Sequence, residues 1–201
     1  MRVVLATSNP GKQREFAALL APFGMELLLQ SQLGVDSPPE TGASFAANAL
    51  LKAAYAAQCT GLPALADDSG LEVDALGGAP GVRSARYAGE HASDADNNAR
   101  LLEDLQAVPD ERRGARYRCV LALVRGPNDP APLFAHGEWR GRIGHSAIGT
   151  GGFGYDPYFV PEGLTVTVAQ LPAEEKNRLS HRGQALRSLA ALLKAGQESW
   201  R

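Results

Sequence analysis

Cysteine is scarce in this chain of 201 residues, which contains only two, Cys59 and Cys119. Neither belongs to a Cys-x-x-Cys pair, and there is no third thiol, which argues against a disulfide framework and against a thiolate metal site. Cys59 follows an alanine-rich segment and Cys119 lies in an apolar run. We therefore expect both thiols to be reduced, buried and without a catalytic role.

The chain also lacks an excess of charge and any long hydrophobic run. Its 20 basic and 22 acidic residues leave a formal net charge of -2, so overall electrostatics do not favour a nucleic-acid polymer or an anionic membrane as partner. No apolar run approaches the roughly 18 residues of a membrane span, and the N-terminal M-R-V-V-L-A turns polar too soon for a signal peptide. We expect a cytoplasmic protein in which any anionic ligand is held by a local cluster.

An apolar content of 44% at this length is enough for one well-filled core, and we expect a single domain over residues 1–201. Short apolar runs predict strands at 2–6, 25–30, 63–66, 116–125, 133–143 and 158–160. Helical spacing predicts helices from residue 10 and at 44–58, 97–105 and 181–194. This irregular order favours a mixed α/β fold with an interrupted sheet over a regular βαβ series.

The stretch T-S-N-P-G-K, residues 7–12, follows the first predicted strand and precedes a helix. It is not a Walker loop, because Gly11 is its only glycine and Gln13 follows Lys12. Pro10 suits the first position of a helix, where no backbone N–H is needed. The residues alone leave two interpretations open: a phosphate-binding turn, or simply the connection between strand and helix.

Two adjacent acids stand at the predicted end of the third strand, in A-D-D-S-G. Asp67 and Asp68 would point to opposite sides of an extended chain, so only one of them can face a given site. Carboxylates of this kind can hold Mg²⁺ together with water and phosphate oxygens. They can equally cap a turn, and both interpretations stay open.

A polar line marks the helix predicted after P-E-T-G, residues 39–42. Ser44, Asn48 and Lys52 are four residues apart and therefore share one face of a helix whose other faces are apolar. Either Lys52 meets an anionic partner in the interior, or its aliphatic chain carries the ammonium out to water.

The glycine cluster G-T-G-G-F-G, residues 149–154, matches the dinucleotide-binding fingerprint letter for letter. The fingerprint needs a helix directly afterwards, however, and Y-D-P-Y-F-V follows instead. We infer a loop whose backbone can approach a ligand closely and whose Phe153 or Tyr155 could stack on a flat ring. The alternative is a tight loop with both aromatic rings packed into the core.

The last motif, E-E-K-N-R-L-S-H-R, spans residues 174–182. Ser180 suits an N-cap, which would place the N–H groups of His181 and Arg182 at the positive end of the last helix, where they could meet a phosphate or a carbonyl oxygen. His181 has the setting of a ligand contact, although a surface helix start would look the same.

These motifs, in this order, closely resemble the inosine triphosphate pyrophosphatase family. The resemblance covers nearly the whole chain and rests on T-S-N-P-G-K, E-T-G from Glu40, N-A-L-L-K-A from Asn48, D-D-S-G-L from Asp67, L-G-G-A-P-G-V-R-S-A-R-Y from Leu76, G-G-F-G-Y-D-P from Gly151 and E-K-N-R-L-S-H-R-G-Q-A-L from Glu175. Ala47, where many bacterial members have Glu, departs from the pattern without touching the residues that the chemistry needs.

The resemblance implies an elongated two-lobed α/β fold around a long mixed β-sheet with flanking helices, a nucleotide cleft between the lobes and, usually, a homodimer. It implies that Glu40 and Asp68 hold Mg²⁺ and that Asp68 is the catalytic base, with Asp67 as a possible helper. For substrate binding it implies Thr7, Ser8, Asn9, Pro10, Gly11, Lys12 and Lys52 at the triphosphate, Ser69 beside them, and Phe153, Gly154, Tyr155, Asp156, Lys176, His181 and Arg182 around the base. A dimer interface is expected near L-G-G-A-P-G-V.

The implied reaction is hydrolysis of non-standard purine nucleoside triphosphates such as ITP, dITP and XTP to the monophosphate and pyrophosphate, which keeps these bases out of DNA and RNA. The roughly four negative charges of a triphosphate repel the attacking water unless Mg²⁺ and lysines draw charge away. Hypoxanthine and xanthine present a 6-oxo acceptor where adenine presents a donor. Buried donors would therefore disfavour adenine by roughly 1–3 kcal/mol each.

Two other functions compete with this one. The chain could be a pyrophosphatase for another nucleotide, such as a modified pyrimidine, or a nucleotide-binding regulator without catalysis. A pure binder has little need of a base beside a metal ion, so Glu40, Asp68, Lys12 and Lys52 favour an enzyme.

Overall fold

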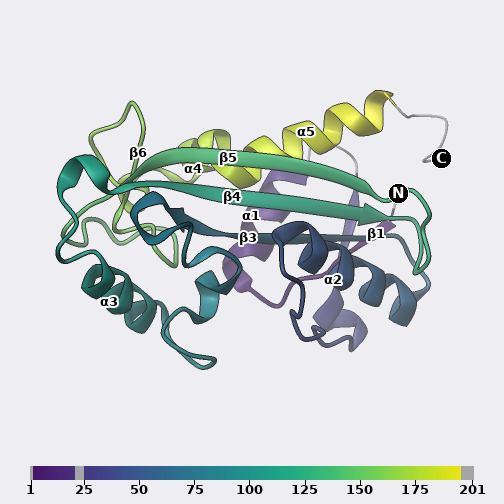
Figure 1. Ribbon diagram of the computed structural model, residues 1–201. Helices are drawn as coiled ribbons and strands as arrows, with labels where there is room; N and C mark the ends of the chain where they lie inside the picture. The colour runs from purple at the N-terminus through teal and green to yellow at the C-terminus, as the bar shows by residue number, and fades with distance from the viewer. Residues whose placement is uncertain (1, 21–24, 196–201) are drawn as a thin grey trace. The chain divides into compact units, whose positions relative to one another are not determined.

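The computed structural model describes residues 2–20 and 25–195 (Figure 1). Its strands are β1 (Arg2–Leu5), β2 (Glu26–Leu29), β3 (Ala64–Val73), β4 (Gly114–Val124), β5 (Leu133–Ile143) and β6 (Phe159–Pro161). Its α-helices are α1 (Pro10–Leu20), α2 (Phe45–Thr60), α3 (Asp94–Asp104), α4 (Ala173–Leu179) and α5 (His181–Ala195). Short 3-10 helices cover Gln30–Leu33, Asp74–Leu76, Gly81–Arg86, Asp110–Arg112 and Val168–Gln170.

The strands form one mixed sheet in the order β2-β1-β3-β4-β5-β6. β1 runs parallel to β2 and β3, whereas β5 and β6 are antiparallel. The expected mixed α/β fold with flanking helices is confirmed. The chain groups into two compact units: the first unit comprises Met1–Asp68, Cys119–Gly137 and Arg182–Arg201, and the second comprises Ser69–Arg118 and Glu138–His181.

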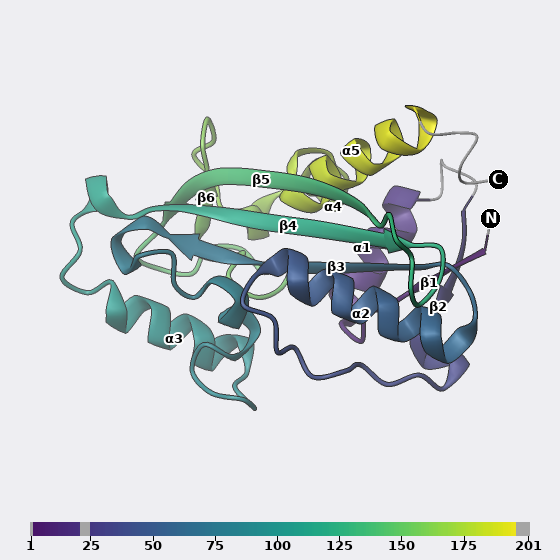
Figure 2. The same cartoon turned by 45° about the vertical axis from the view of Figure 1, so that its right-hand side comes forward.

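In the first unit, helices cover both faces of the strands. Val3 and Leu5 of β1 pack in one cluster with Phe16 of α1 and Leu186 of α5. Residues of opposite parity, such as Val4, pack in another cluster with the alanines of α2. Figure 2 shows α2 lying along the strands. The alternation of side chains thus assigns each strand residue to the α1/α5 face or to the α2 face.

The second unit has a core of its own. Leu71 of β3, Leu101 of α3, Tyr117 of β4 and Phe159 of β6 belong to one buried cluster. Arg113, directly before β4, is 2% exposed and donates hydrogen bonds to the backbone carbonyls of Leu105, Ile143 and Gly144. Its guanidinium therefore joins three segments of this unit.

The predicted elements agree with the structure at most positions. α1 begins at Pro10, α2 follows an N-cap at Ser44, and α5 begins at His181. β4 and β5 correspond to the predicted strands at 116–125 and 133–143; they are neighbours in the sheet and are connected by residues 125–132.

Two predicted boundaries were wrong, and one helix was not predicted. The third strand does not end at Ala66, because β3 continues through Asp67 and Asp68 to Val73. α3 begins at Asp94, where Ser93 and Asp96 form a capping box. α4 was missed, since seven residues are too few to show a helical period.

The two thiols differ. Cys119 is buried, and this burial raises its pKa to about 12, as expected of a thiol without a catalytic role. The prediction that Cys59 is buried was wrong, because its position in α2 faces solvent. Among residues 2–20 and 25–195, no helix has both the length and the apolarity needed to cross a bilayer.

Candidate active site

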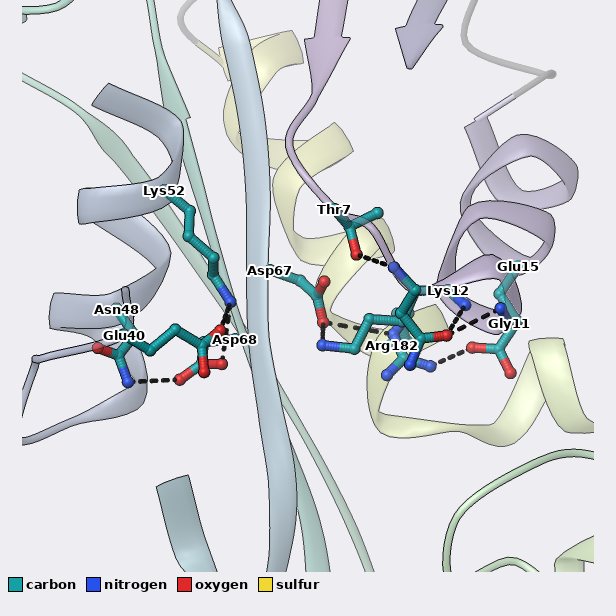
Figure 3. Close-up of polar contacts among 11 residues, drawn as sticks. Thr7, Gly11, Lys12, Glu15, Glu40, Asn48, Lys52, Asp67, Asp68 and Arg182 are labelled. Carbon is teal, nitrogen blue, oxygen red and sulfur yellow. Dashed lines mark hydrogen bonds and ion pairs between the residues drawn. The ribbon is translucent and has the colours of Figure 1, made fainter. Parts of the chain in front are cut away.

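β3 carries the two adjacent acids of the site, and its alternation separates them. Asp67 has the parity of Leu65, which packs against α1 and α5, whereas Asp68 has the parity of Ala66, which packs against α2. Figure 3 shows the two carboxylates on opposite sides of the strand. The predicted opposition of Asp67 and Asp68 is therefore confirmed, and each acid has its own set of partners.

Asp67 lies in a buried ion-pair cluster with α1 and α5. Its Oδ2 lies 2.8 Å from Lys12 Nζ and 3.6 Å from Arg182 Nε, and Arg182 also pairs with Glu15 (Figure 3). Burial alone would raise the pKa of Asp67, but Lys12, then Arg182 and Lys52, outweigh it and hold this pKa well below its usual range. Asp67 is thus ionised at neutral pH and anchors two cations.

Asp68 lies in a second cluster with α2 and the loop before it. Lys52 Nζ lies 3.1 Å from Asp68 Oδ1 and 2.6 Å from Glu40 Oε1, and Asn48 Nδ2 donates to Asp68 Oδ2 at 3.1 Å. Burial raises the pKa of Asp68 by more than the lysines lower it, and the negative charge of Glu40 raises it further. A carboxylate with a raised pKa and a polar surrounding is suited to accept a proton.

The polar line of α2 is confirmed by these contacts. Ser44 Oγ accepts a hydrogen bond from the backbone of Ala47, and Asn48 Oδ1 accepts one from Gly42 N at 2.7 Å. Lys52 is 7% exposed and has carboxylate partners, so it does not extend into water. Gly42 has no room for a side chain, because a Cβ there would lie 2.5 Å from the Asn48 oxygen.

The T-S-N-P-G-K turn is organised around Asn9. Its Oδ1 accepts hydrogen bonds from the backbone N–H groups of Gly11 and Lys12, and Thr7 Oγ1 accepts one from Asn9 N (Figure 3). Asn9 therefore caps the start of α1, where N–H groups and the helix dipole favour an anion. The side chains of Ser8 and Pro10 are exposed beside this helix start.

Glu40 and Asp68 present the oxygen ligands that Mg²⁺ requires. One oxygen of each carboxylate already lies within hydrogen-bonding distance of a single cation, the Lys52 ammonium. Mg²⁺ is commonly held by one or two carboxylates and completes its shell with water and phosphate oxygens. The donor set therefore fits Mg²⁺, although among the described residues no three His, Cys, Asp or Glu side chains form a complete metal cage.

In the second unit, Asp156 organises the glycine-rich loop. Its Oδ2 accepts hydrogen bonds from Phe153 N at 2.9 Å and from Lys176 Nζ at 2.7 Å, and Tyr117 Oη donates to its Oδ1 at 3.2 Å. The Lys176 ammonium also lies 4.6 Å from the centroid of the Phe153 ring. Gly152 is required here, because a Cβ would lie 2.0 Å from Asp156 Oδ2.

The two aromatic residues of this loop have different environments. Tyr155 packs in the core of the second unit, and its hydroxyl donates to Ser84 O at 2.8 Å. Phe153 is only half-buried. Packing into the core therefore holds for Tyr155, and Phe153 is the ring left in a position to stack. Gly154 is held by α3, since its N–H donates to Asp94 and its carbonyl accepts from Asn98.

His181 and Arg182 begin α5 but have different partners. The His181 ring is buried and stacks on Tyr117 in the second unit, with centroids 4.8 Å apart and planes 11° apart. Arg182 belongs to the first unit, where it pairs with Glu15 and Asp67. Its role at the edge of the base stays a prediction, as does the role of Ser69, which is half-buried in β3 directly after Asp68.

Sequence reasoning missed Glu15, Tyr117, Asp94 and Asn98. Glu15 lies one helical turn after Gly11 on α1, which is a weak signal that it could share the site. In the sequence, Tyr117 looks like an ordinary residue of a buried strand. Only its contacts with Asp156 and His181 show that it supports two predicted site residues.

Comparison with known proteins agrees with this geometry. The Ham1 family model matches residues 3–192. A relative from Pectobacterium atrosepticum, named dITP/XTP pyrophosphatase, is 59% identical over 96% of this chain and 98% of its own length.

Solved structures of Ham1 proteins from Coxiella burnetii and Staphylococcus aureus have TM-scores of 0.89 and 0.85 and are 47% and 38% identical. They cover 97% and 98% of this chain, and the chain covers 99% and 100% of theirs. The resemblance read from the motifs is confirmed, and the chain belongs to the Ham1 family.

Proposed function

We propose that this protein hydrolyses non-standard purine nucleoside triphosphates, such as ITP, dITP and XTP, to the nucleoside monophosphate and pyrophosphate. The observation that carries the proposal is the separation of two adjacent carboxylates: Asp68 shares Lys52 with Glu40, at 3.1 and 2.6 Å, while Asp67 pairs with Lys12 and Arg182. The pKa of Asp67 is lowered and that of Asp68 is raised, and environments that push the pKa values of two acids apart assign them different roles. The relative named dITP/XTP pyrophosphatase supports the substrate class.

The triphosphate is proposed to meet the start of α1 and the two lysines. Thr7 and the side-chain amide nitrogen of Asn9 supply hydrogen-bond donors, and the positive end of the α1 dipole favours an anion. Lys12, anchored by Asp67, and Lys52 supply positive charge. Ser8, Pro10 and Gly11 shape this turn, and Ser69 is proposed to contact the substrate beside Asp68.

Asp68 is proposed to accept the proton of the water that attacks the α-phosphorus. The new phosphorus–oxygen bond forms as the bridging bond to the β-phosphate breaks, and pyrophosphate leaves with the bridging oxygen. Mg²⁺ held by Glu40 and Asp68 would, when bound, acidify that water and withdraw charge from the phosphates. Lys12 and Lys52 neutralise the charge that builds up on the leaving group.

The base is proposed to be read by residues of the second unit. Phe153 offers the stacking surface, and Gly154 and Tyr155 contribute through the shape of their loop. Lys176, held by Asp156, and His181, held by stacking on Tyr117, are donors suited to a 6-oxo group. Arg182, which belongs to the first unit, is proposed as a further donor. Adenine would leave such donors without partners, which disfavours ATP.

Pyrophosphate release tests the proposal directly. The purified protein is incubated with ITP, dITP, XTP and the four standard triphosphates, with and without Mg²⁺. We expect Mg²⁺-dependent release from the first three, its loss in Asp68→Asn, and its retention in Glu174→Gln, which changes an exposed acid of α4.

Each competing function has its own signature in this assay. Equal rates on ATP, or orthophosphate as the only product, contradict the proposal. A faster reaction with a modified pyrimidine triphosphate would indicate another pyrophosphatase. Tight ITP binding without turnover would indicate a regulator.

We also propose that the protein is a cytoplasmic homodimer with its interface near residues 76–82, in L-G-G-A-P-G-V. Its small polar substrates belong to the nucleotide pool. Sedimentation equilibrium should give twice the chain mass of 21.2 kDa, and a large residue placed at Ala79 should shift the mass toward the monomer. A concentration-independent monomer contradicts this assembly.

A further inference from the structure

The Lys52 ammonium already occupies the position between the two proposed metal ligands. Its Nζ lies 2.6 Å from Glu40 Oε1 and 3.1 Å from Asp68 Oδ1, and its side chain is 8% exposed (Figure 3). The second oxygen of Asp68 accepts a hydrogen bond from Asn48. Both Asp68 oxygens are therefore engaged within the first unit, and a cation is already neutralising the carboxylate pair.

A divalent ion on the same oxygens and an ammonium at these distances exclude each other. Two cations on one pair of carboxylates repel strongly in a partly buried site. Displacing Lys52 alone is also unfavourable, because a buried ammonium without an anion loses its hydration without compensation. The ion can therefore take the carboxylates only when Lys52 has another anion to pair with.

A triphosphate supplies that anion. We propose that Lys52 is the resident cation of the Glu40–Asp68 pair in the free enzyme, and that it is exchanged for a divalent ion only when a phosphate group takes over the ammonium. The inference rests on the proposed function and defines its substrate as the metal–nucleotide complex. Lys52 is thus a specificity-determining residue: it makes the site accept the metal ion together with the nucleotide and not the free ion.

Lys12 provides the matched comparison. It is a second lysine of the same unit, with its side chain 14% exposed, and it pairs with Asp67 across β3 from Glu40 and Asp68. Removing the charge of Lys12 makes the electrostatic potential at the site more negative but leaves the Glu40–Lys52–Asp68 contacts in place. A direct competition at the carboxylate pair therefore distinguishes Lys52 from Lys12.

The test is the affinity of the free protein for Mn²⁺, measured without nucleotide by electron paramagnetic resonance of the unbound ion. We expect Lys52→Gln to bind Mn²⁺ at least about tenfold more tightly than the natural protein, since a resident positive charge next to the site is gone. Lys12→Gln should gain less, and the double variant Lys52→Gln/Glu40→Gln should lose the gain.

A second measurement avoids any dependence on how well a Lys52 variant folds. Glu40→Gln alone should leave Mn²⁺ affinity unchanged, because the ammonium keeps the ion off this pair in the free protein. The inference is overturned if Lys52→Gln gains nothing, if its gain survives removal of Glu40, or if Glu40→Gln alone weakens binding. None of these titrations involves turnover, so they can fail while pyrophosphate release from ITP still succeeds.

Discussion

Exchanging each of the two adjacent acids for asparagine should affect stability in opposite ways. Asp67 is fully buried between Lys12 and Arg182. Removing one partner of a buried ion pair typically costs about 3–5 kcal/mol. Because Arg182 keeps Glu15, we expect the lower end, about 3 kcal/mol, for Asp67→Asn. For a chain of this size that corresponds to a fall in Tm of roughly 6–12 °C at neutral pH.

Asp68→Asn should leave the protein as stable as before, or more stable. A pKa raised in the folded state means that ionised Asp68 is less favourable in the fold than in the unfolded chain. Its contribution to stability is complete below the ordinary value of 3.8 and is lost as pH rises through the raised folded pKa. The neutral amide avoids this loss. Such a result would fit the proposed role of Asp68 as a catalytic base, because groups placed for function often cost stability.

The contribution of Asp67 to stability depends on pH in the opposite direction, since its folded pKa is lowered. Its contribution is present above the ordinary value of 3.8 and is lost as pH falls through the folded pKa. Thermal unfolding of both variants and the natural protein, followed by circular dichroism from about pH 4 to pH 8, measures both effects. The Tm of Asp67→Asn should stay below that of the natural protein throughout. The Tm of Asp68→Asn should rise relative to that of the natural protein as pH rises. An equal loss in the two variants at pH 7 would refute the assignment.

Three further substitutions test the supports of the site. Gly42→Ala should lower kcat for ITP about tenfold, because the new Cβ displaces the Asn48 amide from Asp68. Gly126→Ala, with no atom within 4 Å of its Cβ, is the control and should have no effect. Arg113→Met should lower the free energy of unfolding by about 3 kcal/mol or more, measured with urea, because three carbonyls lose a buried donor. Asp156→Asn should raise KM for ITP more than it lowers kcat, since it loosens the loop that is proposed to bind the base; an unchanged KM contradicts that role.

The elements of this fold follow from local patterns wherever one face of an element is apolar. An apolar run predicted β5, and helical spacing from residue 44 predicted α2. The alternation of side chains along an extended chain predicted that Asp67 and Asp68 face opposite ways. These features depend on residues that are close together in the chain, so they can be predicted from the sequence.

Features that depend on distant partners could not be predicted in the same way. β3 continues past Ala66 because its buried acids are neutralised by lysines of α1 and α2, and the sequence cannot show that these side chains meet them. Tyr117 was missed for the same reason. Its ring and hydroxyl matter only because His181 and Asp156, far along the chain, lie against them.

The two adjacent acids hold different lysines on the two faces of β3. Asp67 holds Lys12 on the α1 face with a carboxylate that is ionised at neutral pH. Asp68, the next residue, offers Lys52 a carboxylate whose charge is poorly solvated. An anion that draws Lys52 away leaves Asp68 without its counter-ion and raises its affinity for another cation. Phosphate binding and metal binding at Glu40 and Asp68 should therefore favour each other, and by linkage each strengthens the other to the same degree.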